Sequence, residues 1–354
     1  IGRLAFSAST DGADNIAIGR SALAVSGNDG DTNIAIGLSA LGTGDVAGAG
    51  NIGIGASALA AVTSGTNNIG VGLTASDALL SGTDNIAIGR LAFSASTDGA
   101  DNIAIGRSAL AVSGNDGDTN IAIGLAALGT GDVAGAGNIG LGASALTALT
   151  SGTNNIAMGL TSADALLSGT DNIAIGRLAA SATTDGANNI AIGESAFAAS
   201  VNDGDNNIAI GNTAMGASDV AGHDNIALGR DTADALTSGA CNIALGQGSL
   251  GQTTTGCENI GIGYVALGGA ALTGSDNIAI GRQPADAMTS GACNIAIGKA
   301  ALGASTTGCN NVALGLNTMG VAITTGVDNI AMGQGASKNL TSGGYNIGIG
   351  YQAG

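Results

Sequence analysis

The feature that most limits how this chain can fold is a short segment, Asn-Ile-Ala-Ile-Gly, which recurs throughout the 354 residues. It is first complete at residues 15–19, and successive copies are always 17 or 18 residues apart. The anchor asparagines are Asn15, Asn33, Asn51, Asn68, Asn85, Asn102, Asn120, Asn138, Asn155, Asn172, Asn189, Asn207, Asn225, Asn242, Asn259, Asn277, Asn294, Asn311, Asn329 and Asn346. A fixed period of this length indicates a repeat architecture, in which each repeat packs on its neighbours.

Each copy of the segment has the pattern of a short strand. The first and third positions after Asn are large and apolar, as in Ile16 and Ile18, so we expect a strand with one face buried. The second position is always Ala or Gly, and the fourth is always Gly. Side chains this small suggest that another layer of backbone or another chain lies against them, and we expect the second position to form an interface between chains. This expected interface column includes Ala17, Ala35, Gly53, Gly70 and Ala87.

The rest of each repeat supplies a second short apolar segment, such as Ala22-Leu23, and a turn such as Thr63-Ser64-Gly65. Parallel stacking would place equivalent residues about 4.8 Å apart, so the repeats predict a rod on the order of 100 Å long. The asparagine column then forms a ladder of side-chain amides, beginning with Asn15, Asn33, Asn51, Asn68, Asn85 and Asn102. The predicted fold is an all-β parallel β-solenoid of about 20 coils, with residues 1–354 as a single domain.

Charge and composition limit the function. The net charge of −17, with nine Lys plus Arg, argues against binding to nucleic acid or to an anionic membrane. No apolar run is long enough to insert into a membrane. Because solenoids need capping ends and the chain begins within a repeat, at Ile1, we expect it to be a segment of a longer fibrous polypeptide.

Eight of the nine cationic residues occupy the position just after the invariant Gly: Arg3, Arg20, Arg90, Arg107, Arg177, Arg230, Arg282 and Lys299. The same column contains Leu and Tyr, so we interpret it as a partly exposed edge along which long side chains lie. The alternative is a ligand-binding stripe.

The four cysteines form two equivalent pairs. Cys241 and Cys257 precede their anchor asparagines by one and two residues, and Cys293 and Cys309 repeat this arrangement. Neighbouring coils would bring each pair to a Cα separation of about 6 Å, so we predict Cys241–Cys257 and Cys293–Cys309 disulfides. Free thiols and bridges between chains are the alternatives. Disulfides would imply an extracellular protein, and the spacing is poor for a zinc site.

No catalytic site is expected. His223 is the only histidine and lies in a turn, with no support for a Ser/His/Asp set. Acidic turns pair Asp29 with Asp31 and Asp116 with Asp118, which raises calcium as an alternative to simple turn preference. The calcium-loaded Gly-Gly-x-Gly-x-Asp repeat is absent from the sequence, so we expect no cofactor.

The pattern Asn-Ile-Ala-Ile-Gly-x-x-Ala-Leu followed by a Thr/Ser-Gly turn resembles the head repeats of YadA-like trimeric autotransporter adhesins. It is also similar to repeats in phage and other viral tail fibres. The resemblance covers the whole chain and implies a left-handed β-roll assembled as a homotrimer. The repeats here are longer, and the extra residues fall in the turn. No ligand-binding residue can be transferred, because the shared columns are structural.

We therefore expect a structural and adhesive fibre shaft that holds a receptor-binding tip away from a virion or a cell. Its partners would be two further copies of itself and, through a tip outside this segment, a host-cell surface or receptor. A bacterial trimeric adhesin head is the near alternative to a viral tail fibre. More distant alternatives are an ice- or surface-binding solenoid, disfavoured because threonines are confined to turns, and a calcium-dependent solenoid of a secreted enzyme.

Overall fold

A computed structural model of the chain describes residues 1–7, 11–25, 30–112, 117–200 and 204–354. These residues form two compact units, 1–177 and 178–354. Each unit is a stack of three-residue parallel strands joined by turns, and no described residue lies in a helix. The expected all-β parallel β-solenoid is confirmed for each unit.

The strands of the first unit are β1 (Ile16–Ile18), β2 (Ile34–Ile36), β3 (Ile52–Ile54), β4 (Ile69–Val71), β5 (Ile86–Ile88), β6 (Ile103–Ile105), β7 (Ile121–Ile123), β8 (Ile139–Leu141), β9 (Ile156–Met158) and β10 (Ile173–Ile175). Those of the second unit are β11 (Ile190–Ile192), β12 (Ile208–Ile210), β13 (Ile226–Leu228), β14 (Ile243–Leu245), β15 (Ile260–Ile262), β16 (Ile278–Ile280), β17 (Ile295–Ile297), β18 (Val312–Leu314), β19 (Ile330–Met332) and β20 (Ile347–Ile349).

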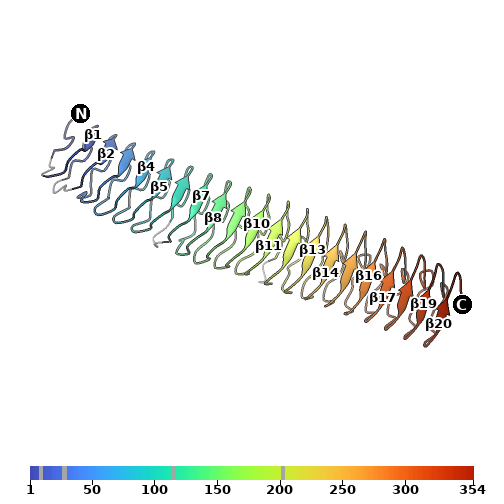
Figure 1. Cartoon of the computed structure of the whole chain (residues 1–354). Helices are drawn as coiled ribbons and strands as arrows, with labels where there is room; N and C mark the ends of the chain where they lie inside the picture. Colours follow the sequence, from blue (N-terminus) through green and yellow to red (C-terminus); the bar gives the residue numbers. More distant parts are fainter. Residues whose placement is uncertain (8–10, 26–29, 113–116, 201–203) are drawn as a thin grey trace. The chain divides into compact units, whose positions relative to one another are not determined.

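Consecutive strands within a unit pair in parallel and in register. Ile86 of β5 lies opposite Ile103 of β6, and Ala87 lies opposite Ala104. The same one-to-one pairing places Ile295 of β17 opposite Val312 of β18. Figure 1 shows the strand arrows of each unit side by side and pointing the same way. Each sequence column is therefore a row of equivalent residues along the stack.

Two corners of each coil account for two further columns of the repeat: the residue before the anchor Asn and the invariant glycine. The residue before the anchor Asn has a left-handed backbone, with φ of 57° at both Asp84 and Asn154. Asp, Asn and Gly recur there because they tolerate this conformation. At the invariant glycine column, Gly106 has a φ of 134°, and a Cβ at this residue would lie 2.4 Å from the carbonyl oxygen of Gly124. Only glycine fits that second corner.

The interior of the coil is filled by one or two large side chains per repeat, such as Leu146 and Leu149 in one coil. Leu59 is fully buried, and a Cβ at Gly70 would lie 2.9 Å from its Cγ. The second strand position is small because it points inward against this leucine row. Ala35 and Ala87 are 0% exposed in the single chain.

The expected chain-interface column is therefore wrong for the buried Ala35, Gly53, Gly70 and Ala87. Ala17, in the first strand of the stack, is half-buried. The large residues of the strand point outward, so the two strand faces are the reverse of the sequence-based expectation.

Within each unit the anchor asparagines form a hydrogen-bonded ladder. Asn138 Oδ1 accepts hydrogen bonds from the backbone N–H and the Nδ2 of Asn155, at 3.0 Å each. Asn138 Nδ2 donates to Asn120 Oδ1 at 3.1 Å and to the Gly152 carbonyl at 2.8 Å. The backbone-to-side-chain step also links Asn15, Asn33, Asn51, Asn68, Asn85 and Asn102 in turn. The ladder satisfies polar groups that the corner would otherwise bury without partners.

Candidate functional site: the isoleucine face

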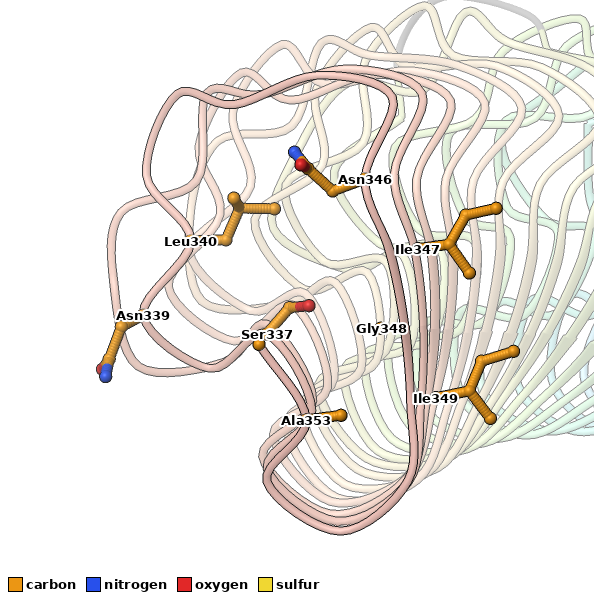
Figure 2. Close-up of a pocket in the computed structure, with 9 residues that line it drawn as sticks. Ser337, Asn339, Leu340, Asn346, Ile347, Gly348, Ile349 and Ala353 are labelled. Carbon is orange, nitrogen blue, oxygen red and sulfur yellow. The ribbon is translucent and has the colours of Figure 1, made fainter.

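The outward side of the strands presents large apolar side chains to solvent. In each unit we call the first and third residues of its strands the isoleucine face. Figure 2 shows the arrangement in the last coil, where Ile347 and Ile349 point away from the coil and Asn346 and Leu340 point into it. In the middle of the first unit, Ile88 remains 40% exposed although stacked neighbours cover its sides.

The isoleucine face contains no polar residue in any of the twenty strands. Its positions hold only Ile, Val, Leu or Met. A three-residue strand is about 10 Å long, and ten strands at about 4.8 Å spacing extend about 45 Å, which gives an apolar face of about 450 Å² in each unit. A typical monomer has a largest apolar patch of about 300–600 Å², often functional. Each unit therefore carries a face at the scale of a binding surface.

Opposite charges border the two ends of the strands. The acidic edge lies two residues before each strand and contains Asp14, Asp84, Asp101 and Asp171 in the first unit, and Asp224, Glu258, Asp276 and Asp328 in the second. The cationic edge lies two residues after it and contains Arg20, Arg90, Arg107 and Arg177 in the first unit, and Arg230, Arg282 and Lys299 in the second. Arg3 occupies the same column before the first strand. The apolar face of each unit is thus bordered by negative charge on one side and positive charge on the other.

The cationic edge is exposed along both units. Arg282 lies over the ring of Tyr264, 5.6 Å from its centroid, and Arg230 Nε lies 3.6 Å from Asp231 Oδ2. These surface contacts contribute little to stability, which leaves the charges able to engage a partner.

The four cysteines are free thiols in the structure, so neither predicted disulfide is formed in it. Cys257 Sγ accepts a hydrogen bond from the backbone N–H of Ala240, the residue before Cys241, at 3.4 Å. Cys309 Sγ accepts the equivalent bond from Ala292 at 3.4 Å. The structure thus places each pair at adjoining backbone positions of neighbouring coils, and the Cys241–Cys257 and Cys293–Cys309 bridges stay a prediction for an oxidised chain.

The acidic turns have a structural use. Asp31 Oδ1 accepts a hydrogen bond from the Ala13 N–H at 2.7 Å, and Asp118 Oδ1 accepts one from the Ala100 N–H at 2.7 Å. Each carboxylate satisfies a backbone donor of the preceding coil, which accounts for its recurrence without calcium. Their suggested calcium partners, Asp29 and Asp116, lie outside the described residues.

Four other carboxyls are partly buried. Desolvation by burial raises the pKa of Asp77, Asp164, Asp234 and Asp286 above the usual value. At Asp234, bonds from the backbone of Ala217 and Gly216 oppose this rise. The nearby charge of Asp231 adds to the rise at Asp234. Ionising these carboxyls in the folded chain therefore lowers its stability.

A hollow of about 560 Å³ lies at the last coil, lined by Ser337, Leu340, Asn346, Gly348 and Ala353 among others. Figure 2 shows that it is the interior of the final coil seen end-on. Ile347 and Ile349 of the isoleucine face also border it. The columns of Leu340, Asn346 and Gly348 are buried in the preceding coils, so we assign the hollow to the solenoid core.

No protein-family model matches the chain, and a search of curated proteins found no match. None of the residues that the structure describes lies in a helix long and apolar enough to cross a membrane. The isoleucine face, which sequence reasoning assigned to the interior, is the strongest candidate for a functional surface.

Proposed function

We propose that this chain is a shaft segment of an extracellular fibre, which assembles as a homotrimer and holds a receptor-binding tip away from its base. The observation that carries the proposal is the isoleucine face, outward and uninterrupted in the strands of each unit. The base would be a virion, with a bacterial surface as the alternative. The proposed role is structural and adhesive, without catalysis.

A second and a third copy of the same chain are the occupants that best fit the isoleucine face. Each unit offers an apolar face of about 450 Å², which is a substantial part of the roughly 800 Å² that each partner buries in a standard protein interface. Copies of this chain share its strand spacing, so their side-chain rows can interdigitate along the stack.

The charged borders favour a cyclic arrangement of parallel copies. When copies are related by rotation about an axis along the stack, the acidic edge of one copy lies beside the cationic edge of the next. Such complementarity guides association and register more than it adds affinity. The resemblance to YadA-like heads and viral fibre repeats supports three copies and a left-handed coil, and these remain part of the proposal.

The energetic gain per side chain is modest but repeated. Fully burying an isoleucine is worth about 1.5–3 kcal/mol, so covering one that is still 40% exposed contributes about 0.6–1.2 kcal/mol. Introducing lysine at such a position would bury an unpaired charge, which costs far more than the lost apolar contact. A few lysines on the isoleucine face should therefore prevent association.

The test is sedimentation velocity on the wild-type chain and on the double variant Ile88→Lys/Ile123→Lys. Both isoleucines point outward, at 40% and 39% exposure, so the variant can fold as a single chain. The matched control is Ser64→Lys/Ser151→Lys, which adds the same charge at two exposed turn positions away from the isoleucine face. We expect a threefold mass for the wild type and the control, and a monomer for the isoleucine variant. Circular dichroism would establish that all three fold alike.

A monomeric wild type would contradict the shaft proposal. It would leave the isoleucine face open to another surface and return the ice- or surface-binding solenoid to first place, which a thermal-hysteresis assay would then examine. A trimer that survives both lysines would show that the chains associate through a different surface.

A further inference from the structure

The only histidine of the chain lies beside one of its four cysteines. Side-chain donor atoms of His223, Asp224 and Cys241 all lie within 4.8 Å of one another. Among the described residues this is the one group of three such donors found. We propose that these three side chains bind a divalent transition-metal ion of the zinc class.

The repeat itself brings the three residues together. His223 and Asp224 directly precede the anchor Asn225, and Cys241 directly precedes Asn242 of the next coil, so Asp224 and Cys241 occupy the same column. Their φ values of 58° and 59° are nearly equal. The backbone N–H of Cys241 donates to the carbonyl of His223 at 3.0 Å. Backbone pairing between the coils therefore fixes the positions from which the three side chains extend.

The donor geometry suits a small tetrahedral ion. His223 Nδ1 lies 2.7 Å from Asp224 Oδ2, and the whole group spans at most 4.8 Å. Tetrahedral zinc with nitrogen, oxygen and sulfur ligands at about 2.0–2.3 Å requires its ligand atoms to be about 3.3–3.6 Å apart. The observed separations bracket this range. Because the side chains of His223 and Asp224 are 60% and 52% exposed, small rotations can close the remaining difference.

The chemistry of the donors selects the class of metal. Imidazole, thiolate and carboxylate are a set that zinc and its transition-metal neighbours accept, whereas calcium requires six to eight oxygen ligands. Three protein ligands leave one tetrahedral position for water. Binding takes the cysteine as its thiolate, so one proton is released from the thiol for each ion bound.

The chain contains a matched control for this site. The second cysteine pair repeats the same framework, with Ser275 and Asp276 preceding Asn277 and with Cys293 preceding Asn294. The Cys293 N–H donates to the Ser275 carbonyl at 3.0 Å, as Cys241 does to His223. The two places differ at the metal-ligand positions only by Ser275 in place of His223. A site that depends on the imidazole should therefore exist at Cys241 and not at Cys293.

The experiment titrates the full chain with Co²⁺ and with Zn²⁺ in the presence of a non-thiol reductant, so that every cysteine is a free thiol. We expect one equivalent of Co²⁺ to produce a thiolate-to-metal charge-transfer band, and Zn²⁺ to displace it. His223→Asn and Cys241→Ser should each weaken Co²⁺ binding by more than the roughly 10–100-fold that loss of an outer-shell partner costs. Cys293→Ser should leave binding unchanged.

Three results would overturn the proposal: no charge-transfer band in the wild type, equal binding by His223→Asn, or a loss in Cys293→Ser as large as in Cys241→Ser. The last would indicate unspecific binding to thiols. All three substitutions are at surface positions, and circular dichroism would show that each variant keeps the wild-type fold.

Discussion

Removing one rung of the asparagine ladder should damage the solenoid more than its single side chain suggests. We consider Asn138→Ala, in the middle of the first unit. The substitution removes the acceptor for both the backbone N–H and the Nδ2 of Asn155, and the donor to Asn120 Oδ1 and to the Gly152 carbonyl. These groups are buried, so water cannot easily replace the missing partner.

The size of the effect follows from the groups left without partners. The Asn155 N–H loses its acceptor, Asn138 Oδ1, and an unsatisfied buried donor costs about 1–3 kcal/mol. Asn155 Nδ2 keeps its bond to the Gly169 carbonyl at 2.7 Å, and Asn120 Oδ1 keeps the Asn138 N–H at 2.9 Å. These groups are only partly unsatisfied, so each should add no more than the roughly 0.5–1.5 kcal/mol of one hydrogen bond. We expect the free energy of local unfolding around this rung to fall by about 3–5 kcal/mol.

Native-state hydrogen exchange is the suitable assay, because a long repeat array need not unfold in one step. A loss of about 3 kcal/mol corresponds to exchange about 150-fold faster in the peptide that contains β8 and β9, since 1.4 kcal/mol is tenfold. The matched control is Asn154→Gly, which removes an exposed asparagine one residue before the ladder. Its column already contains Gly50 and Gly137, so the free energy of local unfolding should change by no more than about 0.5 kcal/mol.

Equal exchange rates in Asn138→Ala and Asn154→Gly would refute this reasoning. That outcome would mean that the ladder bonds add nothing beyond what water or a shifted backbone supplies. The strand pairing alone would then hold the coils together.

Two further substitutions test the corner and the buried carboxyls. Gly106→Ala should lower the free energy of unfolding by about 2–6 kcal/mol, because it adds backbone strain and a clash with the next coil. Ala104→Gly lies in a column that accepts glycine and should lower it by about 1 kcal/mol. Thermal melting of the two variants distinguishes these values, and equal melting temperatures would contradict the corner argument. Burial raises the pKa of Asp164 in the folded chain, so its favourable contribution is present below about pH 3.8 and is lost as pH rises through the folded pKa. Asp164→Asn should raise the melting temperature at pH 7 but not at pH 3, and an equal shift at both pH values would show that ionisation is not the cause.

Much of the fold is readable from the sequence because each column has one physical requirement. The invariant glycines predict a corner closed to any Cβ, and Gly106 meets that requirement. The uniform asparagines predict a shared hydrogen-bond partner, and the side chain of Asn138 makes five hydrogen bonds. Register follows directly, since equal spacing stacks equal residues.

The orientation of the strand could not be predicted from alternation alone. A period of two says that Ile86 and Ala87 face opposite ways, but not which of them faces inward. The usual rule places the larger residue inside, and it fails here because Leu79 and the leucine row occupy the narrow interior. An interior filled by this row leaves room for only a methyl group or a hydrogen at the second strand position.

The metal-ligand cluster was missed for a related reason. Counting cysteines alone gives a poor zinc site, since the four lie in two separated pairs. The stacking of neighbouring coils places His223 and Asp224 beside Cys241. The turn that contains His223 has no cysteine of its own, and the third donor, Cys241, comes from the following coil.

The division of apolar side chains between the two sides of the coil links stability to assembly in the proposed fibre. Leu59 is fully buried within the chain, whereas Ile88 keeps 40% of its surface in water. Each repeat therefore leaves two large side chains that only a partner can cover. If that partner is another copy, stability must depend on chain concentration, because binding that favours the folded state stabilises it by mass action. Ile88→Lys/Ile123→Lys should abolish this concentration dependence together with the trimer. The wild-type melting temperature should be measured across the concentrations at which the mass of the assembly changes. If it does not change over that range, folding is independent of assembly, and the isoleucine face has no role in stability.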